Sequence, residues 1–93
     1  MAQATISQLR HLIRTLNYVV STHAAEALED DKLNILDLET IVLTGQIIER
    51  QRDAQTREVK CIVAGSTRDG TPAQVVVKIG ITGRLIVITA YVA

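Results

Sequence analysis

Six polar residues in this 93-residue chain have the types that acid–base or anion-binding chemistry needs. They are His23, Glu49, Arg68, Lys78, Arg84 and Tyr91. Imidazole and carboxylate groups transfer protons, cationic side chains stabilise a developing anion, and a phenol donates hydrogen bonds. These residues are far apart in the sequence, so the elements that carry them decide whether they form one site.

His23 lies at the start of an expected helix. Thr22 is the best N-cap for this helix, which is predicted to run to about Leu28 or Asp30. The dipole at a helix N-terminus disfavours a cation, so His23 is biased toward the neutral imidazole that suits a general base. The favoured alternative is structural: His23 caps the helix or bonds to a backbone carbonyl. One histidine without a titratable partner is weak evidence for a site.

Glu49 follows two isoleucines in an expected strand and can reach a site at the sheet surface. The favoured alternative is a solvated carboxylate paired with Arg50 or, across strands, with Lys60.

The three candidate cations occupy turns and strand ends. Arg68 is expected in a loop, and Lys78 and Arg84 flank one hairpin. Each is also explained as a solubilising charge at an edge or turn. Arg84 is the strongest candidate for a site, whereas Lys78 lies between apolar neighbours on the solvent face, which favours a structural role.

Charge and composition narrow the class of protein. Residues 1–93 are predicted to form one domain, and 47% apolar residues are enough for a core. Ten basic residues balance ten acidic ones, which removes the global pull of most nucleic-acid binders but still allows a local basic patch. The lone Cys61 excludes an intramolecular disulfide and a cysteine-rich zinc site, and its apolar strand predicts a buried, inert thiol. No metal or cofactor is predicted.

Targeting signals are not expected. Gln3, Ser7 and Arg10 interrupt any apolar run at the N-terminus, so no signal peptide is predicted. Polar residues and glycines divide the apolar C-terminal region into pieces too short to span a bilayer. A cytoplasmic, reducing setting is expected.

Three helices are predicted in the first half. Thr5 and Gln8 form a capping box for a helix over residues 5–16, which Asn17 ends as a left-handed cap. Residues 18–20 are a short extended piece before the helix of His23. Asn34 or Asp37 caps a third helix, whose buried stripe is Ile35, Leu38, Ile41 and Val42 and which Gly45 ends.

From Gln46 the apolar period changes to two. Strands are expected from Ile47 to Gln51 and over residues 58–64, 73–79 and 84–92, and their short loops predict an antiparallel meander. The predicted fold is therefore α+β, with about three helices packed on one face of a four-stranded antiparallel sheet. The last strand, "LIVITAYVA", is apolar on both faces, so it is either central or covered by a partner chain, for example in a homodimer.

The second helix also carries an unusual charge pattern. Glu29, Asp30 and Asp31 crowd its C-terminal end, where each acid costs a few tenths of a kcal/mol through the dipole. Either the helix ends before them or a basic partner arm neutralises them. A solvated loop is the favoured alternative, and under either one the acids repel RNA close to His23.

Four strings carry a family resemblance. "THA" opens the second helix, "VLTGQIIER" follows the third, and "CIVAGSTRDGTPAQVVVKI" and "LIVITAYVA" complete the sheet. In this order they resemble the bacterial family called domain of unknown function 4258, over residues 18–92. That family is distantly similar to BrnT-like toxins, which have a RelE-like fold and cleave RNA in toxin–antitoxin pairs.

The resemblance implies a small intracellular bacterial protein with RNA as substrate, a cognate antitoxin as partner and a metal-independent ribonuclease site. His23 would transfer the proton, Glu49 would orient it or act as a base, and Arg84 would stabilise the phosphorane. Arg68 and Lys78 would contact phosphates, and Tyr91 would stack on a base or bond to a phosphate oxygen.

Two departures from the family pattern leave the activity open. Ala27 and Leu28 stand where family members commonly carry arginine, and Gln74 stands where many carry histidine. Two hypotheses remain: a toxin-like RNA-cleaving domain, active or degenerate, and a non-catalytic interaction module that associates through the apolar C-terminal strand or the acidic helix end. A ribonuclease would show a basic cleft with His23 at its edge. An interaction module would show a flat apolar or acidic patch.

Overall fold

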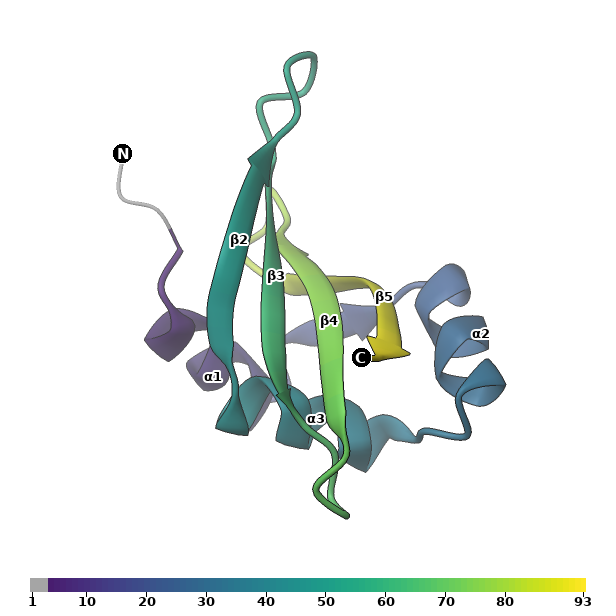
Figure 1. Cartoon of the computed structure of the whole chain (residues 1–93). Coiled ribbons are helices and arrows are strands. Elements are labelled where there is room, and N and C mark those ends of the chain that lie inside the picture. Colours follow the sequence, from purple (N-terminus) through teal and green to yellow (C-terminus); the bar gives the residue numbers. More distant parts are fainter. Residues whose placement is uncertain (1–3) are drawn as a thin grey trace.

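A computed structural model describes residues 4–93, which form three helices and five strands (Figure 1). The helices are α1 (Ile6–Arg14), α2 (Thr22–Asp30) and α3 (Ile35–Thr44). The strands are β1 (Tyr18–Val20), β2 (Gln46–Arg52), β3 (Val59–Ser66), β4 (Pro72–Ile79) and β5 (Leu85–Val92). The predicted α+β class is confirmed.

The strands form one sheet in the order β1-β5-β4-β3-β2. The last four make the predicted antiparallel meander. The prediction of four strands, all antiparallel, is wrong, because β1 pairs in parallel with β5, with Tyr18 opposite Leu85 and Val20 opposite Val87. β1 has only three residues and its partner strand is the last in the sequence, so no local sequence pattern predicts this pairing. This pairing makes β5 an interior strand, which is one of the two alternatives that its apolar faces predicted.

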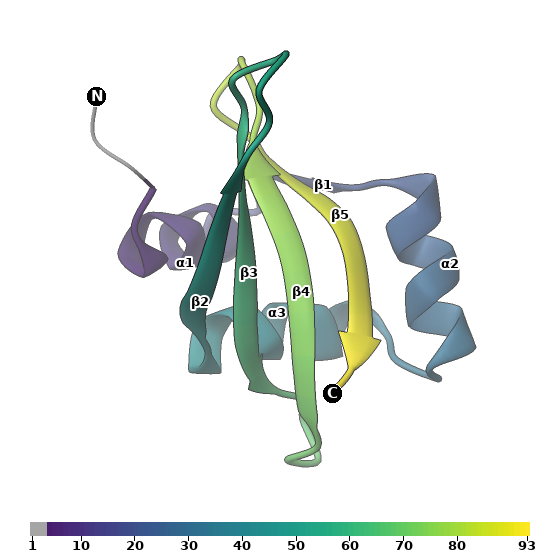
Figure 2. The same cartoon turned by 45° about the horizontal axis from the view of Figure 1, so that its top comes forward.

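The helices cover one face of the sheet and one of its sides. Figures 1 and 2 show α1 and α3 behind the sheet and α2 beside β5, while the other face is uncovered. The core lies between the sheet and the helices. Its largest buried side chains are Leu9, Ile13, Leu38, Ile41, Val42, Cys61, Val63, Val75, Val77, Leu85 and Val87.

Two glycines bring the end of α3 close to β3. A Cβ atom on Gly65 would lie 2.2 Å from the carbonyl oxygen of Ile41, and one on Gly45 would lie 2.6 Å from that of Ala64. Both distances are far shorter than any van der Waals contact, so helix and strand approach here at backbone distance.

Two helix ends differ from prediction. Ser21, not Thr22, is the N-cap of α2: its hydroxyl accepts from the backbone N–H of Ala24 (3.0 Å) and donates to the carbonyl of Ile88 (3.2 Å). Both residues can cap a helix, and this contact with β5 favours Ser21.

The end of α1 also differs from prediction, because the helix ends at Arg14 and not at Leu16. The capping box of Thr5 and Gln8 is confirmed, but Leu16 rather than Asn17 has the left-handed backbone, with φ 59°. Asn17 already belongs to the sheet, because its carbonyl accepts from the N–H of Leu85 (2.9 Å). In α3, Asn34 is the N-cap, and Ile35 is 42% exposed instead of buried.

Candidate functional site

The uncovered side of the sheet, here called the open face, carries side chains in three rows. The row nearest the β4–β5 turn contains Val19, Ile86, Lys78, Lys60 and Gln51. The middle row contains Thr89, Val76, Ile62 and Glu49. The third row contains Tyr91, Gln74, Ala64 and Gln46. Three of the six predicted site residues, Glu49, Lys78 and Tyr91, therefore share this face.

Lys78 and Glu49 already have polar partners. The ammonium of Lys78 forms an ion pair with Glu58, with 2.5 Å between Nζ and Oε2. The carboxylate of Glu49 accepts a hydrogen bond from the side-chain amide of its neighbour on β2, Gln51. Lys78 therefore has a partner that gives it a structural role. Glu49 contacts Gln51 and not the expected Arg50 or Lys60, since Arg50 donates to the carbonyl of Ala4 (2.9 Å).

Tyr91 also has a partner on the open face. Its hydroxyl donates to Oε1 of Gln74, 2.7 Å away on β4. Gln74 is the residue that stands in the place of the family's histidine, so the departure from the family pattern lies on this face. The pair is a hydrogen bond between a phenol and a side-chain amide and carries no charge.

His23 is the second residue of α2 and is exposed. The helix begins beside β5, because the backbone N–H of Ser21 donates to the carbonyl of Val87 (3.1 Å). Ser21 caps the helix, so capping is not the role of His23. Within residues 4–93 no hydrogen bond or ion pair holds its imidazole.

Arg68 and Arg84 lie at opposite ends of β4. The backbone N–H of Arg68, in the β3–β4 loop, donates to the carboxylate of Asp37 (3.1 Å). The carbonyl of Arg84, in the β4–β5 turn, accepts from the N–H of Gly80 (2.8 Å). The eight residues of β4 span about 24 Å at ~3.4 Å per residue. The two arginines therefore cannot contact the same phosphate.

The predicted catalytic residues are also separated across the sheet. Glu49 is on β2, and His23 lies beyond β5. Three strand spacings of ~4.8 Å place these two residues more than about 14 Å apart. A general acid and a general base must both reach one phosphodiester within hydrogen-bond distance. The described fold therefore does not bring His23 and Glu49 together.

The acids at the end of α2 are inside or adjacent to the helix, which continues to Asp30. Asp31 has a structural role, because Oδ2 accepts from the backbone N–H of Val92 (2.8 Å) and so terminates β5. Glu29 and Asp30 are exposed.

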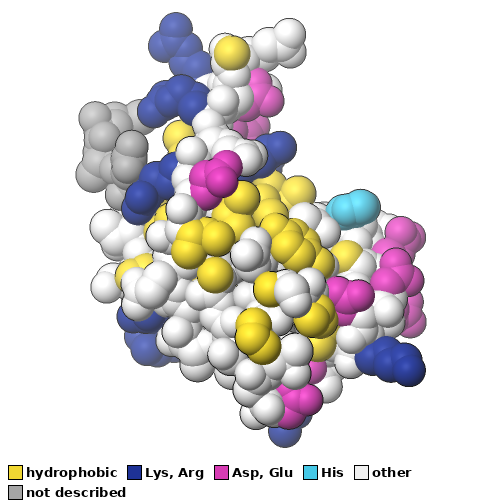
Figure 3. Space-filling model, viewed as in Figure 1, with side chains coloured by type: hydrophobic (Ala, Val, Ile, Leu, Met, Phe, Trp, Pro, Cys, Tyr) yellow, Lys and Arg dark blue, Asp and Glu magenta, His cyan; other side chains and the backbone are white. Residues whose placement is uncertain are grey.

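Charge is segregated although the chain is neutral. Six of its ten Lys and Arg residues belong to one end of the sheet, here called the hairpin end: Arg50, Arg52, Arg57, Lys60, Lys78 and Arg84. The same end carries three acids, Glu49, Asp53 and Glu58, which leaves an excess of three positive charges. Helix α2 with Asp31 carries four acids and neither Lys nor Arg. Figure 3 shows the cations around the hairpin end and the acids over α2.

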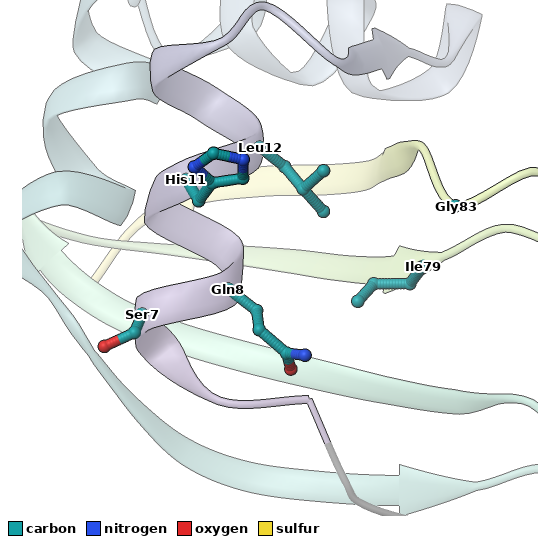
Figure 4. A pocket seen from close by; sticks show the side chains of 6 residues that line it. All are labelled: Ser7, Gln8, His11, Leu12, Ile79 and Gly83. Carbon is teal, nitrogen blue, oxygen red and sulfur yellow. The ribbon is translucent and has the colours of Figure 1, made fainter.

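A cavity of about 430 Å³ lies between α1 and the β4–β5 turn (Figure 4). Its lining residues are Ser7, Gln8, His11, Leu12, Ile79 and Gly83. None of the six predicted site residues lines it, and its one titratable group is His11. The sequence contained no signal for this cavity, because α1 and the turn meet only in the folded chain.

No three His, Cys, Asp or Glu side chains of residues 4–93 come together as a metal site. No helix within that range is long and apolar enough to cross a membrane. Cys61 is buried as predicted, and burial raises the pKa of its thiol.

The fold and the open face define a small α+β domain with helices on one face of a five-stranded sheet. The family described as Domain of unknown function (DUF4258) matches residues 20–92. The chain belongs to this family, which confirms the resemblance seen in its strings. No curated protein and no solved structure matches the chain.

Proposed function

We propose that the domain is a non-catalytic protein-interaction module that binds through the open face of its sheet. The observation that carries this proposal is the composition of that face. Its centre is aliphatic, with Ile62 and Val76 in the middle row and Ile86 and Val19 beside Lys78 in the next. Charged and amide side chains surround this centre.

A solvated sheet face would carry polar residues at these positions. Antiparallel sheets with one face in water alternate apolar and polar residues along each strand. In β3 and β4, however, Ile62 and Val76 point to the side opposite the buried Val63 and Val75. Ile48 on β2, 56% exposed, adds to the apolar surface. An aliphatic centre with a polar rim is the usual composition of a protein interface.

Site-specific photo-cross-linking tests the module. A photoreactive amino acid is placed at Ile62, in the open face, or at Ile35, which is exposed on α3 away from it. Protein adducts are expected in cells from position 62 and not from position 35. Circular dichroism verifies that both variants fold. Equal labelling from the two positions, or none from position 62, would overturn the proposal.

The second candidate is the RNA-cleaving domain that the resemblance implies, with a cognate antitoxin as partner. The observation that favours it is the positive excess at the hairpin end, since cations there would attract a phosphate backbone. In this alternative His23 transfers the proton, Arg84 and Lys78 contact phosphates, and Glu49 orients the substrate. Arg68 would then contact a distant part of the same RNA, and Tyr91 would stack on a base.

RNA cleavage by the purified protein separates the two functions. The assay compares the wild type with His23→Ala, with and without ribosomes. His11→Ala is a matched control, because His11 lies on α1 in the cavity of Figure 4. The module predicts no cleavage by any of the three proteins. Cleavage that is lost in His23→Ala and kept in His11→Ala would establish the nuclease and contradict the module.

A further inference from the structure

We infer that the partner that the open face fits is a second copy of this chain, with the strands of the two sheets crossing at about 90°. This inference rests on the proposed function, because it uses the same face. It is carried by the two charge patches, which lie on adjacent sides of the open face and have opposite signs.

The positions of the patches are defined by the fold. The hairpin end consists of the β2–β3 and β4–β5 turns and the strand residues next to them, so it lies at one end of the strand direction. Of its cations, Arg50 points to the helix side of the sheet, where it donates to the carbonyl of Ala4 (2.9 Å). Helix α2 lies beside β5 and runs from the level of Val87 to that of Val92, so its acids flank the face across the strands, at the end away from the β4–β5 turn. Figure 3 shows both patches bordering the apolar centre of the same face. A partner that complements this face needs an acidic side and a basic side around an aliphatic centre, which is the composition of the chain itself.

Symmetry selects one arrangement of the two copies. A symmetric pair that meets face to face is related by a two-fold axis in the interface plane. An axis across the strands would leave both α2 helices on the same side of the pair, so that acids of one copy lie near acids of the other. An axis along the strands would place each hairpin end over the other, where cation faces cation.

A two-fold axis along the diagonal of the face turns the strand direction of one copy onto the across-strand direction of the other. It places the hairpin end of each copy over α2 of the other, and this favourable contact occurs twice. The same operation makes the strands of the two sheets cross at about 90°, which is one of the two ways in which sheets pack face to face. Ile62 and Val76 lie near the axis, where each copy meets its equivalent.

The size of the face predicts a weak dimer. Five strands at a spacing of ~4.8 Å and a strand length of about 24 Å give a face of about 450 Å² per copy. A standard stable interface buries about 800 Å² per partner. The aliphatic centre alone is therefore small, and the attraction between patches must contribute. Such an attraction weakens as salt screens it.

Charge exchange between two variants tests this arrangement by sedimentation velocity. One variant carries Glu26→Lys, Glu29→Lys and Asp30→Lys, which changes α2 with Asp31 from four negative charges to an excess of two positive ones; it leaves Asp31 because it binds Val92. The other carries Arg52→Glu with Arg57→Glu at the hairpin end. Each variant alone is expected to be monomeric, since its two patches then have the same sign. An equimolar mixture is expected to form a heterodimer, because the patches are complementary again. Arg14→Glu on α1, away from the open face, is the control and should dimerise like the wild type.

The wild type is expected to dimerise at protein concentrations up to about 500 µM in about 20 mM salt and to dissociate when the salt is raised to about 500 mM. A monomeric wild type in low salt would overturn the inference, as would a mixture that stays monomeric. If position 62 still cross-links to a different protein in cells, the proposed function stands while the self-association fails. If no position-62 adduct forms at all, both fail.

Discussion

The contact between α3 and β3 predicts a large effect for a single methyl group. In Gly65→Ala the new Cβ would lie 2.2 Å from the carbonyl oxygen of Ile41 and 3.0 Å from the Cα of Gly45. Both neighbours are backbone atoms, so no side-chain rotation relieves the overlap. Helix and strand must separate by about 1 Å, which loosens the contacts of Ile41 and Val42 with the sheet.

The expected cost is about 3 kcal/mol, the upper part of the range for overpacked cores. For a domain of this size, that corresponds to a fall in Tm of about 12–24 °C. Thermal and urea denaturation followed by circular dichroism measures both quantities. Gly70→Ala is the control, because its Cβ would meet nothing within 4 Å and only its φ of 88° is unfavourable, at about 1 kcal/mol. If Gly65→Ala were no less stable than Gly70→Ala, the close approach of α3 and β3 would be refuted.

Three further predictions concern stability and titration. Burial, followed by the hydrogen bond to Glu39, raises the pKa of Tyr18 to about 12. The stabilising contribution of Tyr18 is therefore complete below pH ~10 and is lost as the pH rises through about 12. If an absorbance titration gave Tyr18 a lower pKa in the wild type than in Glu39→Gln, it would contradict this prediction. Lys32 has a left-handed φ of 57° after α2, so Lys32→Gly should raise the free energy of unfolding in urea by about 1 kcal/mol; no gain would show that the strain is absent. Because burial raises the pKa of the Cys61 thiol, a thiol reagent should label the protein only as fast as it unfolds, and rapid labelling of the folded chain would disprove the inert role.

Local signals predicted most of the elements. The reciprocal bonds of Thr5 with Gln8 and of Asn34 with Asp37 lie within one helical turn, so the sequence shows them directly. The meander follows from a period of two and short loops. Signals of this kind act between neighbours in the chain and need no knowledge of the rest of the fold.

Long-range pairing accounts for the errors. The parallel pairing of β1 with β5 and the choice of Ser21 as N-cap both depend on contacts with β5, and Asn17, which follows the left-handed Leu16, is bonded to Leu85 of β5. These contacts join the two ends of the chain, so no local pattern reports them.

The candidate site shows the same division. Residue types identified His23, Glu49 and Arg84 as groups capable of chemistry, but sheet order separates His23 from Glu49, and the length of β4 separates Arg84 from Arg68. The sequence also shows the acids of α2 next to one another, whereas the placement of Lys78 and Arg84 beside the cations of residues 50–60 exists only in the folded chain.

The sequence by itself therefore determined the α+β class, the capped starts of α1 and α3, the meander and the membership of the family. Each of these depends on residues that are near in the chain or on strings that can be compared directly. Only the tertiary structure decided which face of the sheet is uncovered, that the predicted catalytic groups are separated, and that opposite charges border one aliphatic surface. These properties depend on sheet order and register, which are set by contacts between distant segments.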